Sequence, residues 1–338
     1  MQSMTSAESS RFQILALSGG GFRGAFTAKI LADIERDLGD KRIANYFDLI
    51  AGTSIGGILA LALALEIPAA HMVEFFKEHG DQIFRWRPSM FGILQSSYSP
   101  TQLQKLLEQR DLFGDRLLGA CKHPVIVPSI NYSQGEPVLF KTPHHVDHRR
   151  DHLHRIVDVA MATSAAPSYF PRHRFNDCQY VDGGLYANAP GMLALHEAEI
   201  FFDKHHTDVW LMSIGTMSSK FTVNPKQGTR GGAIDWGHNR FWNMPKRLFG
   251  LSISVQETLA AKMLEHKLKQ RFLPVDEIPS NERAAVIALD NTNRFAKEAL
   301  FGAASEKSKA LSSDPAFKAF LAHSPAKPVF HHGENKTM

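Results

Sequence analysis

The chain has 338 residues, of which 43% are hydrophobic and 21% charged; this balance is ordinary for a globular protein and excludes extensive disorder. The formal net charge is only +4 and no block of Lys and Arg occurs, so we expect no DNA or RNA partner. Two cysteines, Cys121 and Cys178, provide neither a disulfide framework nor metal-ligand spacing, which favours a reducing compartment.

The N-terminal residues and the longest apolar run bear on targeting and membrane insertion. Residues 1–11 are polar and lack the apolar segment of a signal peptide, so we expect a flexible N-terminus. The longest apolar run, Ile58–Leu65, is far shorter than the roughly 20 residues of a membrane-spanning helix. We therefore expect a cytoplasmic, soluble protein that can reach a membrane only at its surface.

Short apolar strands alternate with helical segments over the first two thirds of the chain. The pattern predicts strands at 12–17, 46–51, 124–128, 137–140, 180–181 and 208–214, and helices at 24–38, 56–66, from 68, from 99 and at 153–162. Such alternation is typical of an α/β fold with a mostly parallel sheet. We assign 12–216 to the catalytic core, 217–323 to a mainly helical part of the same domain that could act as a lid, and 324–338 to a loose tail.

A serine lies between two glycines where a predicted strand meets a helix. Gly52-Thr53-Ser54-Ile55-Gly56 fits the pattern G-x-S-x-G, in which a sharp turn exposes the serine hydroxyl and glycines avoid clashes. The apolar strand before it and the Ala/Leu-rich helix after it strengthen the interpretation of Ser54 as a nucleophile. A plain glycine–serine loop that caps a helix is the alternative.

A second glycine-rich turn, Gly19-Gly20-Gly21, follows the first strand. Backbone N–H groups at the start of a helix bind anions, and in an acyl hydrolase that anion is the tetrahedral oxyanion. Arg23 could orient this loop. Gly19, Gly21 and Gly24 also fit a dinucleotide-binding fingerprint, but the next strand does not end in the acidic residue that this fingerprint requires.

A nucleophilic serine needs a base. Among the 17 histidines, His196 and His238 lie in the right region for a triad, yet neither has a recognisable loop signature. Asp182 is the better candidate, because it ends a short strand and is followed by Gly183 and Gly184, which let the backbone turn closely around a site.

Four segments together resemble the patatin-like phospholipases, in the order found in that family. They are Ser18–Gly24, Gly52–Gly56, Ala162–Pro171 and Asp182–Gly184, and the similarity spans roughly Phe12 to Thr216. Ser18 differs from the Asp that many members carry there.

The resemblance implies a three-layer α/β/α fold and hydrolysis of fatty acyl esters by a serine–aspartate dyad. It assigns Ser54 as nucleophile, Asp182 as base and the amides of Gly19, Gly20 and Gly21 as oxyanion hole, with no metal and no histidine. The expected substrate is a membrane phospholipid, and no cofactor is expected for catalysis.

The resemblance also extends to bacterial members that act in cyclic-oligonucleotide antiphage signalling. It implies activation by a cyclic di- or trinucleotide and ligand-driven assembly of copies of the chain. No motif defines the nucleotide pocket; Arg240, Lys246 and Arg247, within an aromatic segment from Trp236 to Leu251, are the candidate contacts. A constitutive lipid esterase and a non-catalytic lipid- or nucleotide-binding protein stay open as alternatives.

Two features have less specific interpretations. The cluster His144, His145, His148, His152 and His154, with Asp147 and Asp151, matches no established metal signature, and Arg149 and Arg150 interrupt it. A solvated loop that leads into a helix is favoured, so we predict no metal site. The aromatic segment near Trp242 could be a lid at the membrane interface, but its helical spacing favours core packing.

Overall fold

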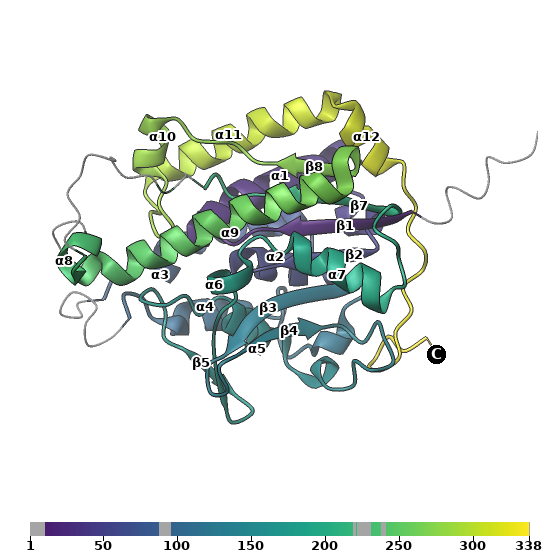
Figure 1. Cartoon of the computed structure of the whole chain (residues 1–338), viewed down its shortest axis with the longest axis horizontal. Coiled ribbons are helices and arrows are strands. Elements are labelled where there is room, and N and C mark those ends of the chain that lie inside the picture. Colours follow the sequence, from purple (N-terminus) through teal and green to yellow (C-terminus); the bar gives the residue numbers. More distant parts are fainter. Residues whose placement is uncertain (1–10, 88–95, 219–220, 222–230, 238–240, 338) are drawn as a thin grey trace, which may run out of the picture.

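The centre of the fold is an eight-stranded sheet with helices on both faces (Figure 1). The computed structural model describes residues 11–87, 96–218, 221, 231–237 and 241–337. The strand order is β5-β6-β3-β2-β1-β7-β8, and β4 pairs with β3. The strands are β1 Phe12–Leu17, β2 Leu49–Gly52, β3 Val125–Asn131, β4 Glu136–Lys141, β5 His173–Phe175, β6 Cys178–Asp182, β7 Val209–Ile214 and β8 Phe272–Val275.

The middle of the sheet is parallel, as the sequence predicts. β1 pairs in parallel with β2 and β7, β2 with β3, and β7 with β8. β4 and β6 run antiparallel to β3, and β3 and β4 form a hairpin. The carboxyl ends of β1 and β2 therefore meet at one edge, where the two glycine-rich turns follow.

Helices separate the sheet from solvent on each side. They are α1 Gly24–Asp37, α2 Ile55–Ala64, α3 Ala69–Ile83, α4 Pro100–Leu107, α5 Ile156–Thr163, α6 Gly184–Ala187, α7 Gly191–Phe201, α8 Ala233–Trp236, α9 Met244–Leu268, α10 Asn281–Val286, α11 Arg294–Ser313 and α12 Pro315–Leu321. In Figure 1, α7 and α9 cross the front face, and α1 and α2 lie behind the sheet.

Successive side chains of β1 point to opposite faces of the sheet and so belong to two different hydrophobic cores. Leu15 and Leu17 belong to the larger core, with α1, α2, α3 and α11. Ile14 and Ala16 belong to the other core, with Leu195 of α7 and with α9. All four side chains are fully buried, which is typical of a central parallel strand.

The last third of the chain contributes a strand that the sequence does not predict. β8 contains Pro274, and a proline in a short run argues against a strand. β8 lies at the edge of the sheet and pairs with β7 alone. An edge strand tolerates Pro274, because the N–H that proline lacks is not needed for a second neighbour. The segment 217–323 is therefore helical for most of its described length, but it also extends the sheet.

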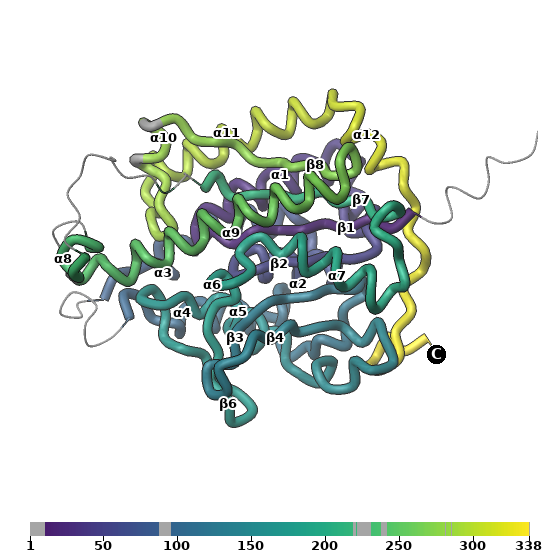
Figure 2. Tube along the Cα trace, viewed as in Figure 1, coloured from purple at the N-terminus to yellow at the C-terminus, as the bar shows by residue number. Residues whose placement is uncertain are grey.

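The C-terminal segment is also better ordered than the expected loose tail. Figure 2 shows it, in yellow, running along the edge of the fold where β1 begins. Phe330 is buried, the His331 N–H donates to the Pro143 carbonyl at 2.8 Å, and the Phe330 N–H donates to Thr337 Oγ1 at 2.9 Å. The burial of one aromatic ring thus fixes a segment whose prolines suggest a coil.

Within the described ranges, no helix is long and apolar enough to cross a membrane.

Candidate active site

Ser54 lies on the sharp turn between β2 and α2, as predicted. Its φ of 55° and ψ of −126° are unusual for a residue with a side chain, and such strain is found at functional sites. The flanking glycines permit the turn: a Cβ on Gly52 would lie 2.1 Å from the Gly56 carbonyl oxygen. A Cβ on Gly56 would lie 2.4 Å from the Leu17 carbonyl oxygen. Both glycines are required by close backbone approach.

The Ser54 hydroxyl donates a 2.7 Å hydrogen bond to Asp182 Oδ2. Asp182 is buried at the end of β6, and its Oδ1 accepts a hydrogen bond from the Gly184 N–H at 2.7 Å. Burial raises the pKa of Asp182 to about 7, against the opposing effects of the Gly184 amide and the Ser54 hydroxyl. A carboxylate with this pKa is a competent base near neutral pH.

The sheet brings the two side chains together across 128 residues of chain. Asp182 pairs with Ser129 of β3, and β3 lies beside β2, which leads to Ser54. Thr163 fastens the turn, since its Oγ1 accepts a hydrogen bond from the Ser54 N–H at 2.9 Å and donates one to the Pro128 carbonyl at 2.6 Å. Thr163 belongs to the segment Ala162–Pro171, whose role the sequence alone does not reveal.

The glycine turn after β1 lies beside the serine, but its three amides are not equivalent. The Gly19 N–H donates to the Asn188 carbonyl at 3.0 Å, so it is occupied. The Gly20 and Gly21 amides have no acceptor among the described residues, and both glycines line the cavity that contains Ser54. Of the three amides that the sequence predicts as oxyanion donors, only those of Gly20 and Gly21 are therefore free among the described residues.

Gly183 and Gly184 have the close contacts that the sequence suggests. A Cβ on Gly183 would lie 2.4 Å from the Pro128 carbonyl oxygen, and one on Gly184 would lie 3.0 Å from Asp182 Oδ1. These positions hold the base against β3.

Arg23 does not reach the nucleophile's hydrogen-bond network directly. It is buried, and its Nη2 donates to Ser218 Oγ at 3.1 Å. Burial lowers the pKa of Arg23, while the charges of Glu257 and Asp276 act in the opposite direction. Arg23 thus stabilises the glycine-rich loop without a contact to the dyad.

The dyad opens into an apolar cavity with about 60 Å³ of space, room for a few water molecules. Its roof comes from α9, through Phe249 and Ile253. Its remaining apolar lining comprises Phe22, Ile55, Ile58, Phe75, Phe76, Ile83, Phe84, Leu103, Ala166, Tyr169, Phe170 and Leu289.

No histidine lines this cavity in the part of the chain that the structure describes. His196 is exposed on α7, and His238 lies outside the described residues. The geometry therefore favours a dyad over a triad.

The aromatic segment from Trp236 to Leu251 contains both buried side chains, as expected for core packing, and exposed ones, as expected for a lid. Phe249 and Ile253 pack in a small core with Tyr98 and Tyr169, whereas Trp236 is 45% exposed. Of the candidate ligand contacts, Lys246 lies 3.3 Å from Asp290, and the Arg247 Nε donates to the Trp236 carbonyl at 3.0 Å. Arg240 lies outside the described residues.

A serine on a strand-to-helix turn, hydrogen-bonded to a buried carboxylate at the carboxyl edge of a parallel sheet, is the arrangement expected of an ester hydrolase. Residues 15–195 match the family model described as patatin-like phospholipase. The chain belongs to the patatin-like phospholipase family.

Three bacterial relatives are similar to this chain over most of their length, and each is called a cGAMP-activated phospholipase. The one from Pseudomonas aeruginosa is 40% identical over 97% of both chains. The one from Escherichia coli is 35% identical over 87% of both chains. The one from Vibrio cholerae is 33% identical over 83% of this chain and 86% of the relative.

Proposed function

We propose that this chain is a phospholipase that cleaves fatty acyl esters through a Ser54–Asp182 dyad and that a cyclic nucleotide activates it. The observation that carries the proposal is the 2.7 Å hydrogen bond from the Ser54 hydroxyl to Asp182 inside an apolar cavity. Asp182 takes the hydroxyl proton as Ser54 Oγ attacks the ester carbonyl. The proton then passes to the leaving alcohol, and an acyl-serine ester remains.

In the second half of the reaction, water gives a proton to Asp182 and attacks the acyl-serine carbonyl. The fatty acid leaves and Ser54 Oγ regains the proton. Each attack places a negative charge on the former carbonyl oxygen. The free amides of Gly20 and Gly21, which line the same cavity, are the proposed donors to this charge, and such preorganised donors stabilise the transition state strongly.

The proposed substrate is a phospholipid in a bilayer. The cavity lining is apolar, which suits an acyl chain. The outer side of the roof helix α9 exposes a line of apolar side chains at helical spacing: Leu248, Val255, Leu259 and Met263. A helix that is apolar on its outer face beside Lys246, Arg247 and Lys262 suits contact with a membrane surface.

Activation is proposed because α9 covers the cavity beside the dyad, through Phe249 and Ile253. A movement of this roof helix would widen the entrance for an acyl chain, and a ligand drives such a change through its higher affinity for the open form. The relatives that are named cGAMP-activated favour a cyclic nucleotide.

The contacts of Lys246 offer a route from an anionic ligand to the glycine turn. Lys246 pairs with Asp290, and the neighbouring Leu289 carbonyl accepts the Phe22 N–H at 2.8 Å, next to Gly21. An anion that draws Lys246 away from Asp290 would release this segment. Arg240 and Arg247 are proposed to contribute to the same site, and assembly of copies of the chain is proposed to accompany it.

The test is a fluorogenic phospholipid assay with a panel of cyclic di- and trinucleotides, run beside light scattering. We expect hydrolysis to rise with one of the nucleotides and the particle size to increase with it. Lys246→Ala should require more nucleotide, while Lys309→Ala, an exposed lysine on α11 away from this surface, should behave as wild type. A chelator in the assay should leave the rate unchanged.

Two other outcomes would replace the proposal. Full activity without nucleotide, and no effect of the panel on rate or size, would indicate a constitutive lipid esterase. Absence of hydrolysis under every condition would indicate a protein that binds lipid or nucleotide without cleaving either.

A further inference from the structure

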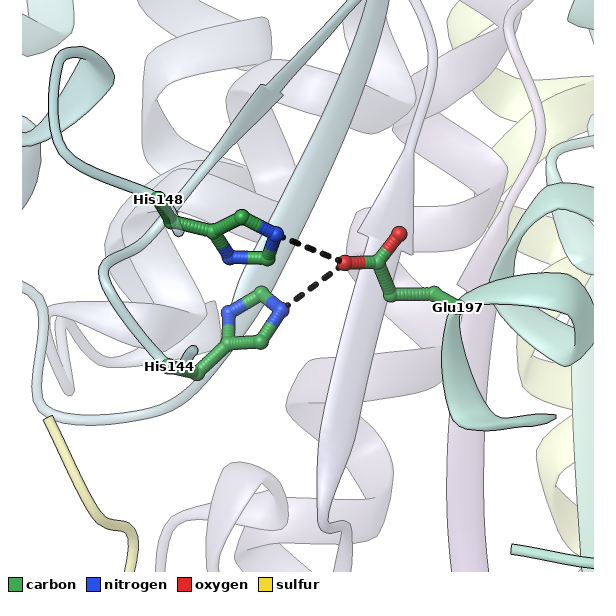
Figure 3. Close-up of side chains that lie close together, drawn as sticks. All are labelled: His144, His148 and Glu197. Atoms are coloured by element: carbon green, nitrogen blue, oxygen red, sulfur yellow. Dashed lines mark hydrogen bonds and ion pairs between the residues drawn. The ribbon is translucent and has the colours of Figure 1, made fainter. Parts of the chain in front are cut away.

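Three potential metal-ligating side chains meet far from the dyad: His144, His148 and Glu197. The two histidines follow β4, whose last residue, Lys141, pairs with Ile126 near the start of β3. Ser54 lies at the opposite edge, where the parallel strands end. Figure 3 shows both imidazole rings pointing a nitrogen at one carboxylate oxygen of Glu197, on α7.

The distances suit a single ion held between the three groups. Glu197 Oε1 lies 3.0 Å from His144 Nε2 and 3.6 Å from His148 Nε2. Ligands about 2.0–2.1 Å from a tetrahedral zinc ion lie about 3.3 Å from one another, so the two observed edges bracket the required value. The ligand atoms of all three residues lie within 4.8 Å of one another, so a small inward movement of the side chains would bring all three to coordination distance of one ion.

His148 is the residue that hydrogen bonding leaves unexplained. Its side chain is only 9% exposed, and its two ring nitrogens are buried without a hydrogen-bond partner in the described structure. A proton on His144 Nε2 would satisfy His144 and Glu197 but leave His148 without a partner. A cation between the three would also give His148 Nε2 a partner.

The surroundings provide the supporting contacts that metal sites need. His144 Nδ1 lies 2.8 Å from Thr142 Oγ1, which can accept its N–H and fix the ring with Nε2 free for a metal. Lys141 Nζ lies 2.6 Å from Glu197 Oε2, so Oε1 remains for the ion.

We propose that His144, His148 and Glu197 form a structural Zn²⁺ site that fastens the loop after β4 to α7. Imidazole and carboxylate ligands suit zinc, and a spacing of three residues between two histidines is common in its sites. A cavity of about 430 Å³ reaches His144 and Phe202 on one side of the cluster. The site is separate from the phospholipase chemistry.

The sequence favours a solvated loop here because the third ligand is distant in the chain. His144 and Glu197 are 53 residues apart, and only the packing of α7 against the loop brings them together. Contrary to the expectation of a solvated loop, the side chains of His144 and Glu197 are fully buried.

The experiment uses untagged full-length protein, stripped with a chelator and dialysed. Zn²⁺ content is measured by equilibrium dialysis and elemental analysis, and Co²⁺ is titrated with its visible absorption as the readout. We expect one ion per chain, a tetrahedral Co²⁺ spectrum, and a melting temperature that Zn²⁺ raises. Loss of an outer-shell contact weakens such sites about 10- to 100-fold, so His148→Ala should lose at least about 100-fold in affinity.

The matched control is His152→Ala, a histidine of the same segment that is not one of the three ligands. It should bind as wild type does. His148 makes no hydrogen bond, so its replacement should leave the stripped protein folded by circular dichroism; Glu197→Gln provides a second variant of similar shape. The proposal is overturned if wild type binds no stoichiometric ion, or if His148→Ala retains wild-type affinity and spectrum.

Discussion

The side-chain amide of Asn188 donates a 2.6 Å hydrogen bond to Glu257 Oε1 and a 3.1 Å hydrogen bond to the Gly19 carbonyl. Glu257 lies on α9, so a single amide joins the roof of the cavity to the glycine turn beside Ser54. Glu257 also interacts electrostatically with the buried Arg23. A displacement of α9 would therefore also displace the glycine turn that carries the proposed oxyanion donors.

Glu257→Ala should reduce both stability and hydrolysis. It removes the Asn188 acceptor and one of the negative charges near the buried Arg23, so that this cation is compensated by Asp276 alone of the two. Glu257→Gln keeps an acceptor and should lose less. Urea denaturation and the phospholipid assay check this; equal behaviour of both variants and wild type would disprove the coupling.

Ser54→Ala should abolish hydrolysis and leave the fold unchanged. Loss of a catalytic nucleophile lowers turnover on the order of a million-fold. Alanine accepts the positive φ of this turn no better and no worse than serine, so the melting temperature should stay close to that of wild type. Turnover is measured beside circular dichroism, and substantial activity in a folded variant would remove Ser54 from the mechanism.

Asp182→Asn should be nearly as inactive, yet no less stable at pH 8. Asparagine can still accept the Gly184 amide, but it cannot take the Ser54 proton. The ionised Asp182 is buried, so its removal relieves a desolvation cost. A scan of single His→Ala variants is the control, and a histidine as essential as Ser54 would indicate a triad.

Hydrolysis should rise with pH through about 7 and level off above it, because the base acts in its deprotonated form. The stability effect has the opposite direction. The pKa of Asp182 is higher in the folded than in the unfolded chain, so the folded state binds more protons between about pH 4 and 7. Over that range the contribution of Asp182 to the free energy of unfolding falls as pH rises. Comparing unfolding of wild type and Asp182→Asn at several pH values isolates this contribution; parallel curves would contradict it.

Gly20→Ala should lower hydrolysis by about 100-fold or more, the usual effect of losing one oxyanion donor. Its Cβ would lie 2.3 Å from Thr216 Oγ1, so the turn must shift and carry both free amides with it. Gly232→Ala is the control, because nothing lies within 4 Å of the added methyl group and its φ is negative. The measurement is turnover at saturating substrate; an unchanged rate in Gly20→Ala would exclude the amides from this role.

The sequence by itself determined the parallel α/β core, the turn at Ser54 and the choice of Asp182. These features depend on local patterns: apolar runs that end in glycine, and glycines required by close backbone contacts next to the functional residues. The spacing of apolar residues and the residue types that a turn requires are set within a few residues of each other. They can therefore be recognised without the rest of the chain.

Only the tertiary structure decided which hydrogen-bonding groups have partners and which distant segments pack together. It places the Asn188 carbonyl on the Gly19 amide, adds β8 at the sheet edge despite Pro274, buries Phe330 in the expected tail, and brings Glu197 to His144. Each of these results depends on partners far away in the chain. Hydrogen bonds and burial between distant segments arise from how layers pack, and no local pattern encodes that packing.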